Sequence, residues 1–83
     1  MKEEIEREYY PNGQLYAETP YKNGKEHGLE KLWNDNGQPW FETPFINGKI
    51  HGLEKWWDNN GILYRKALYK NNAQHGARIE FEY

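Results

Sequence analysis

The chain has 83 residues, of which 11 are Lys or Arg and 13 are Asp or Glu, so its formal net charge is -2. This balance excludes both a nucleic-acid-binding polycation and an acidic tail. Cysteine and serine are absent, which excludes disulfides, thiol chemistry and a serine nucleophile. Aromatic residues make up 17% of the chain, and this richness in β-favouring side chains argues against a helix bundle.

Residues 1–8 are charged rather than apolar, and we interpret them as half of a repeat that precedes three complete ones. The segment lacks the apolar stretch of a signal peptide, and no apolar run in the chain approaches the length of a membrane span. We therefore expect a cytoplasmic protein.

From residue 9 onward the sequence repeats with a period of 24 residues. Complete repeats cover 9–32, 33–56 and 57–80, and residues 81–83 run on past the third. The first two repeats are identical at 14 of 24 positions, and every glycine falls into one of three rows with this period. We interpret residues 1–83 as a single domain of stacked repeats.

Each repeat contains two turn signals separated by runs of strand length. One is Asn-Gly at 12–13, 36–37 and 60–61; the other is Asn-Gly at 23–24 and 47–48, continued by Asn71-Asn72. Asn-Gly suits a two-residue type I′ hairpin turn, in which both central residues have positive φ. The predicted fold class is all-β, a single antiparallel meander sheet of about seven strands at 4–10, 14–21, 26–33, 38–45, 50–57, 62–69 and 74–82. Pro20 and Pro44 each remove one ladder donor, so we expect a local irregularity at both.

The register follows if every Asn-Gly closes a two-residue loop. Leu32 then pairs with Phe41, and the residues nearest the turns form aromatic pairs: Tyr9 with Tyr16, Trp33 with Trp40, and Trp57 with Tyr64. These six would form one aromatic row on a single face, and the row is our candidate partner-binding site because Trp and Tyr anchor interfaces. An alternative register stays open, with bulges at His27-Gly28 and its copies offset by longer loops at 34–37. In that register Trp33 shares a face with Leu15, Phe41 and Phe45.

These motifs resemble the MORN repeat in its bacterial variant form. The resemblance is carried by YKNGKEHG at 21–28, by FINGKIHG at 45–52 and by the Tyr/Trp-x-x-Asn-Gly stretches before them. It implies a sheet of hairpin repeats that acts as a scaffold or adaptor. Proteins that look like this include YwqK-type antitoxins, which implies an alternative role as an antitoxin or immunity protein that neutralises a toxin by direct binding. The third repeat departs from the pattern, because Asn72 replaces glycine and Lys66-Ala67-Leu68 replaces Glu-Thr-Pro.

Residues that could carry chemistry do not converge in this sheet. Equivalent residues lie two strands apart, about 10 Å, whereas zinc ligands lie within about 2 Å of one ion. We therefore expect His27, His51 and His75 to cap turns or pack against aromatic rings. Equivalent carboxylates such as Glu18 and Glu42 are equally far apart. We predict no catalytic residue, no metal site and no cofactor, and hence no enzyme.

The charge pattern narrows the possible partners. Arg7, Lys31 and Lys55 on the sheet are matched by Glu18 and Glu42, and the net charge is negative, so a nucleic-acid groove is not expected. A membrane site is disfavoured, because acidic neighbours dilute the lysines of the basic rim (Lys22, Lys25, Lys49 and Lys70). One position of the repeat is occupied in turn by Glu8, Leu32, Trp56 and Glu80, so its two outer copies are charged and its two inner copies are apolar. Terminal repeats of an array commonly differ in this way, because charge on an edge strand discourages further pairing. We predict a non-catalytic protein-binding or scaffold module that binds another protein or a second copy of itself, without a small-molecule substrate.

Overall fold

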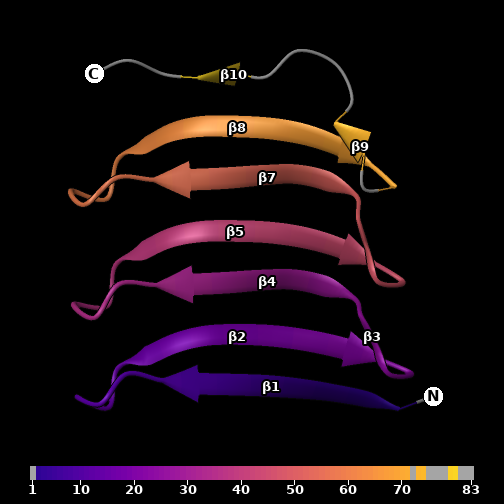
Figure 1. Cartoon of the computed structure of the whole chain (residues 1–83), viewed down its shortest axis with the longest axis horizontal. Coiled ribbons are helices and arrows are strands. Elements are labelled where there is room, and N and C mark those ends of the chain that lie inside the picture. Colours follow the sequence, from indigo (N-terminus) through magenta and orange to yellow (C-terminus); the bar gives the residue numbers. More distant parts are fainter. Residues whose placement is uncertain (1, 72, 75–78, 81–83) are drawn as a thin grey trace.

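In the computed structural model, residues 2–71, 73–74 and 79–80 are described, the last two pairs by their backbone. All strands in these ranges belong to one antiparallel sheet (Figure 1). The long strands lie side by side in chain order: β1 (Glu3–Tyr9), β2 (Leu15–Lys22), β4 (Gly28–Trp33), β5 (Pro39–Ile46), β7 (Gly52–Trp57) and β8 (Leu63–Lys70), followed by β10 (Ile79–Glu80). Short strands complete three hairpins: β3 (Lys25–Glu26), β6 (Lys49–Ile50) and β9 (Ala73–Gln74). The predicted all-β meander is confirmed, although most of its seventh strand, 74–82, lies outside the described residues.

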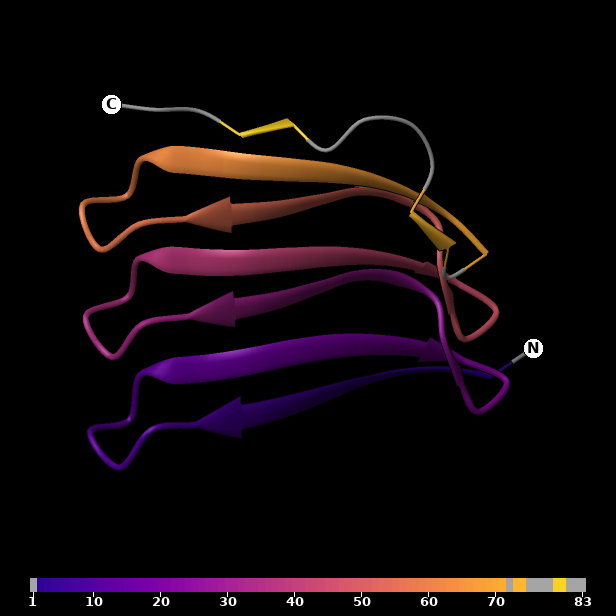
Figure 2. The same cartoon turned by 45° about the horizontal axis from the view of Figure 1, so that its top comes forward.

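The sheet is a single layer with extents of 43 × 38 × 12 Å. In the described part of the chain, no helix or second sheet covers either of its faces (Figure 1, Figure 2). The residues buried among those described are Ala17, Thr19, Thr43, Glu54 and Ala67. The cross-strand register places all five on one face, because directly paired residues and residues two apart on a strand point to the same side. We call this side the core face and the other the open face.

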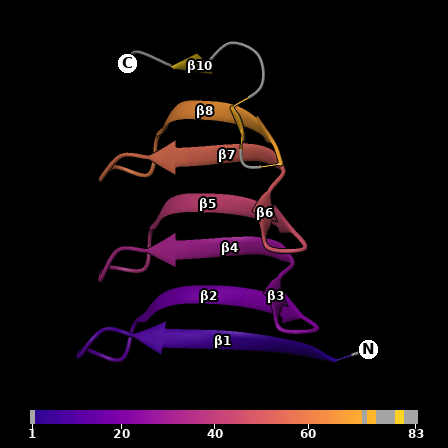
Figure 3. The same cartoon turned by 45° about the vertical axis from the view of Figure 1, so that its right-hand side comes forward.

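The turns at one end of the strands are the predicted two-residue hairpins (Figure 3). Lys22 pairs with Lys25, and Asn23 and Gly24 between them have φ of 54° and 82°. The copy at Asn47-Gly48 has φ of 50° and 81°. Positive φ at both central residues is the type I′ geometry, which confirms the turn prediction here. Asn72 lies outside the described residues.

The turns at the opposite end differ from the prediction. At residues 10–13 the Gly13 N–H donates to the Tyr10 carbonyl at 2.9 Å, and the Tyr10 N–H donates to the Gln14 carbonyl at 2.8 Å. Gly13 has φ of 87°, but Asn12 has no positive φ; its side-chain oxygen instead accepts the Gln14 N–H at 2.9 Å. The same backbone pattern recurs at 34–37 and 58–61. A four-residue β-turn thus closes each of these hairpins, and three residues (11–13, 35–37 and 59–61) lie between the hydrogen-bonded partners, so the prediction of two-residue loops was wrong here.

A bulge accompanies each four-residue turn and changes the register beside it. Leu32 pairs with Phe41 as predicted, but Trp33 pairs with Pro39, which leaves Trp40 as an extra residue. The other hairpins repeat this arrangement, with Tyr9 opposite Leu15 and Trp57 opposite Leu63. The predicted pairs Tyr9/Tyr16, Trp33/Trp40 and Trp57/Tyr64 are therefore wrong, because one residue more is accommodated on the second strand of each hairpin.

The two prolines coincide with the irregularity predicted for them. The strand facing Pro20 is interrupted between β3 and β4, where the His27 N–H donates to the Pro20 carbonyl at 2.9 Å. Gly28 follows with φ of 117°, and a Cβ atom there would lie 3.0 Å from Pro20 Cγ. The His51 N–H bonds Pro44 in the same way at 3.0 Å. Both features of the alternative register, the His-Gly irregularity and the longer loops, are thus present. Its expectation that Trp33 shares a face with Phe41 and Phe45 was wrong, because Trp33 follows Leu32, the direct partner of Phe41, and points to the opposite side.

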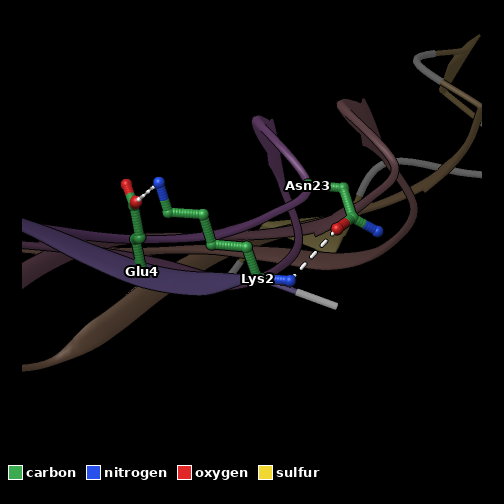
Figure 4. A network of polar contacts seen from close by, with 3 residues as sticks. All are labelled: Lys2, Glu4 and Asn23. Atoms are coloured by element: carbon green, nitrogen blue, oxygen red, sulfur yellow. Dashed lines mark hydrogen bonds and ion pairs between the residues drawn. The ribbon is translucent and has the colours of Figure 1, made fainter.

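The type I′ turn at Asn23-Gly24 also contacts Lys2, next to the start of β1 (Figure 4). The Asn23 N–H donates to the Lys2 carbonyl at 2.8 Å, and the Lys2 N–H donates to Asn23 Oδ1 at 3.2 Å. Lys2 Nζ lies 2.9 Å from Glu4 Oε1, but both side chains are exposed, so this ion pair contributes little. Among the described residues, no helix has the length and hydropathy needed to span a membrane.

Candidate functional site

The open face carries three parallel rows of side chains that cross the strands. The first, which we call the apolar strip, consists of Ile5, Pro20, Leu29, Pro44, Leu53 and Leu68. The second, the charged row, consists of Arg7, Glu18, Lys31, Glu42, Lys55 and Lys66. The third, nearest the four-residue turns, includes Tyr9, Trp33 and Trp57. None of these residues is buried.

The apolar strip is open to solvent along its whole length. Ile5, Leu29 and Leu68 are 53%, 42% and 41% exposed, and the other three members are half-buried. At about 4.8 Å between strands, six neighbouring strands extend the strip over about 24 Å. Contiguous apolar surface of this kind on a small protein marks an interaction site more often than isolated exposed residues do.

The charged row alternates in sign over most of its length. Arg7 Nε donates to Glu18 Oε2 at 2.9 Å, and this is an exposed ion pair. Lys31 pairs across the strands with Glu42, and Glu42 with Lys55, yet these three side chains form no ion pair with one another. These three residues are half-buried, and their charges are not neutralised by one another.

The core face holds the aromatic packing. Trp40 stacks on Phe41 with ring centroids 5.6 Å apart, and Phe41 contacts Trp56 at 5.4 Å. The Arg65 guanidinium lies 4.5 Å from the centre of the Trp56 ring, a cation–π arrangement. These rings contact one another within the chain, so this cluster stabilises the sheet.

One carboxyl group is buried on the core face. Glu54 is 5% exposed, and its Oε2 accepts a hydrogen bond from Thr43 Oγ1 at 3.1 Å. Burial raises the pKa of the Glu54 carboxyl, although hydrogen bonds from Thr43 and Tyr69 partly offset the increase. Burial also raises the pKa of Tyr69, and the Glu54 charge adds to this effect. The Tyr69 hydroxyl therefore holds its proton more tightly than a free tyrosine does, and Glu54 is a buried, hydrogen-bonded carboxyl on the core face.

A hollow of about 230 Å³ opens on the core face where the small side chain of Ala17 occupies the position that Phe41 occupies one repeat later. It is lined by Glu6, Glu8, Tyr16, Ala17, Thr19, Tyr21, Glu30 and Leu32. Glu30 accepts a hydrogen bond from Thr19 at 2.8 Å, which repeats the contact between Glu54 and Thr43. The hollow is thus the first repeat's version of the aromatic cluster, without the central ring.

The six aromatic residues of the predicted site are divided between the faces. Trp40 stacks on its chain neighbour Phe41, so both side chains lie on the core face. Trp33 follows Leu32, the partner of Phe41, and therefore points to the open face. By the same register, Tyr16 and Tyr64 accompany Trp40, whereas Tyr9 and Trp57 accompany Trp33. The prediction of one row on one face was wrong, because each bulge turns the extra residue to the opposite side. Tyr9 and Tyr64 are 60% and 37% exposed, and the other four are half-buried.

The histidines lie beside the type I′ turns. His27 Nδ1 accepts the N–H of Asn47 at 3.4 Å, so this histidine caps the turn of the next repeat, as predicted. His75 lies outside the described residues. In the part of the chain that the structure describes, no group of three or more His, Cys, Asp or Glu side chains could hold a metal ion.

The apolar strip was missed from the sequence, although the repeat contains its signal. Two positions of the 24-residue period are apolar in every copy: one is occupied by Ile5, Leu29 and Leu53, and the other by Pro20, Pro44 and Leu68. The cross-strand register makes these two positions neighbours on adjacent strands, which joins them into one strip.

Comparison with protein families identifies the repeat. The sequence model of the MORN repeat variant matches residues 5–23, 26–47 and 50–71. Each match covers one hairpin closed by a four-residue turn, namely β1–β2, then β3 to β5, then β6 to β8. No match was found among curated proteins or among solved structures.

Proposed function

The chain belongs to the MORN repeat variant family, whose repeats are generally protein- or membrane-binding modules, and from this premise we propose that it is a non-catalytic protein-binding or scaffold module that contacts its partner through the open face. MORN repeats are generally involved in protein interactions. The proposal assigns that general role to one surface of this chain.

The apolar strip is the observation that supports this assignment. Most of the large apolar side chains exposed in the described residues lie on the open face, in the strip and beside it. The charged row and the aromatic residues Tyr9, Trp33 and Trp57 flank it on one side. An apolar centre next to polar and aromatic groups is the usual anatomy of a protein interface.

The core face is less suited to the same role. Its largest rings, Trp40, Phe41 and Trp56, already pack against one another, and every buried residue of the described chain lies on that side. A partner there would contact surface that already stabilises the sheet, whereas the open face offers exposed apolar side chains such as Ile5, Leu29 and Leu68.

The antitoxin role is the finer alternative, and it would use the same surface. A scaffold is expected to capture a protein that stays active, whereas an antitoxin captures a toxin in a stoichiometric, inactive complex. Purification of the complex from the native source, followed by an activity assay of the captured protein, distinguishes the two roles.

Two tryptophan variants on opposite faces test the proposal. We expect W57A to reduce the recovery of the native partner in affinity capture about tenfold, because it removes an aromatic contact from the open face. The matched variant W40A should lower the melting temperature more and leave recovery unchanged at temperatures where it is folded. L29K, at a 42% exposed position, should also reduce recovery without loss of stability. If W40A abolishes capture while W57A and L29K bind normally, the contact surface is the core face and the proposal is wrong.

A further inference from the structure

A folded domain usually consists of at least two packed layers, and this sheet has one. The buried hydrophobic residues in the described chain are Ala17 and Ala67, which contribute little apolar area. Both belong to the core face, and in the described part of the chain no layer covers the open face with its apolar strip. A second layer over the strip would bury apolar side chains that are now exposed to solvent, and this burial would stabilise the protein.

The charged row indicates what that layer could be. Its signs along the strands β1, β2, β4, β5, β7 and β8 are +, −, +, −, + and +. Lys31, Glu42 and Lys55 form no ion pair with one another within the chain, although they are neighbours across the strands. A surface that binds this face must therefore place opposite charges over an alternating row.

A second copy of the chain meets that requirement. Consider a twofold axis that runs parallel to the strands, between the two open faces and midway between β4 and β5 (Figure 1). It places β4 of one subunit over β5 of the other, so Lys31 faces Glu42 of the partner subunit, and Glu18 faces Lys55 of the partner subunit. Each contact occurs twice by symmetry. An axis along the charged row would instead set every charge against its own copy.

The same axis also matches the apolar strip to itself. Leu29 lies over Pro44 of the partner subunit, Pro20 over the partner's Leu53, and Ile5 over the partner's Leu68. Only the outermost contact of the charged row, Arg7 against the partner's Lys66, joins like charges, and Arg7 is already paired with Glu18 in its own subunit. Four central ion pairs thus accompany a continuous apolar contact.

We propose that the chain forms a homodimer in which two open faces pack against each other about this axis. The proposal rests on the proposed function, since it names a second copy as the partner of the open face. A face of 43 × 38 Å is large enough to supply the roughly 800 Å² per partner that a standard interface buries. Face-to-face sheets pack about 10 Å apart with aligned strands, which suits this geometry.

Charge reversal on either side of the axis provides the test. In K31E the new glutamate faces Glu42 of the partner subunit, and in E42K the new lysine faces Lys31 of the partner subunit, so each homodimer contains two like-charge contacts. We expect each variant to dimerise at least about tenfold more weakly than the wild type in analytical ultracentrifugation. The control D35K reverses an exposed charge in a turn away from the strip and should dimerise as the wild type does.

Mixing the two variants separates contacts between subunits from effects within one. In a K31E/E42K heterodimer, both Glu–Glu and Lys–Lys contacts become Glu–Lys contacts. An equimolar mixture should therefore recover dimers, and native mass spectrometry should identify them as heterodimers. A variant that merely misfolds would not be rescued by mixing, and circular dichroism of L29K, which should be folded and monomeric, checks this independently.

The outcomes for the dimer and for the proposed function differ. A wild-type chain that stays monomeric at about millimolar concentration, or dimers that persist in K31E, E42K and L29K alike, would overturn the dimer. The proposed function would still stand if W57A and L29K lose a different captured protein. It would fail together with the dimer if these open-face variants change neither self-association nor capture.

Discussion

Gly48 and Gly52 stand four residues apart in the second repeat but are required for different reasons. Gly48 has φ of 81°, and a Cβ atom there would have its nearest neighbour at 3.8 Å, so only the backbone conformation favours glycine. Gly52 has φ of 125°, and its Cβ would lie 3.1 Å from Cγ and 3.3 Å from Cβ of the rigid ring of Pro44. Both the conformation and the space require glycine at the second position.

We therefore expect the two glycines to respond differently to substitution. G48A should lower the free energy of unfolding by about 1 kcal/mol, the strain of a left-handed residue with a Cβ, and G48N should cost less because asparagine tolerates that conformation. G52A should cost at least about 1 kcal/mol more than G48A, since the proline ring must move as well. Urea unfolding measures all three, and equal losses for G48A and G52A would contradict the role assigned to Pro44.

Glu54 should make stability depend on pH. Because burial raises its pKa above the ordinary value of 4.5, the folded chain binds this proton more tightly than the unfolded chain does. The stability that the protonated carboxyl contributes is fully present below about pH 4.5 and is lost as the pH rises through the folded-state pKa.

The variant E54Q tests this dependence. It keeps an oxygen that can accept the Thr43 hydrogen bond but cannot ionise, so we expect a smaller loss of stability than the wild type shows between pH 4.5 and 8. The matched variant E30Q makes the same substitution in the more exposed carboxylate that bonds Thr19 in the preceding repeat, and so controls for the change of side chain itself. Parallel profiles for E54Q and the wild type would show that Glu54 does not titrate as inferred.

At the scale of elements, one dipeptide forms two kinds of turn. Asn47 adopts positive φ in a two-residue hairpin, whereas Asn36 does not, and its Oδ1 accepts the Gln38 N–H at 3.0 Å. In the third repeat Asp58 takes over this contact, because its Oδ1 accepts the Ile62 N–H at 3.0 Å. The side chain of Asn60 is therefore not the acceptor for this N–H.

Replacement of each asparagine by glycine should distinguish the two kinds of turn. N47G should be nearly neutral, since glycine adopts positive φ readily, whereas N36G loses an acceptor and should cost about 1 kcal/mol. N60G provides the control within the same chain and should cost less than N36G. Thermal melting measures the series; equal effects at 36 and 60 would mean that the Asn36 side chain does not stabilise its turn.

At the scale of the whole molecule, β1 lies at one edge of the described sheet and has a charged residue in a row that is apolar farther inside. Glu8 pairs with Ala17 at the edge, in the position that Leu32 and Trp56 occupy inside the sheet. Charge on an exposed edge opposes further strand pairing.

We expect E8L to promote association of chains edge to edge, which light scattering would detect as species larger than a dimer at increasing concentration. The control E8Q removes the charge without adding apolar surface and should have a weaker effect. If E8L and the wild type have the same mass distribution over the whole concentration range, charge at this position does not limit the array.

The period of the repeat by itself determined the strand order, the meander topology and the place of every turn in the described chain. Each of these depends on local turn chemistry and on strand length, both of which recur every 24 residues. The two interruptions at Pro20 and Pro44 could also be predicted, because proline lacks the N–H that the ladder needs. The apolar strip was within reach too, since its two apolar positions recur in each copy.

Only the tertiary structure decided which face each aromatic residue occupies. Asn-Gly is compatible with a two-residue loop and with a three-residue loop followed by a bulge, and the choice depends on how two whole strands pair. A difference of one residue reverses the side to which a residue points, so Trp40 joined Phe41 on the core face and left Trp33 on the open face. The side chains that each face presents therefore follow from the pairing of strands, an interaction between distant residues that no local pattern specifies.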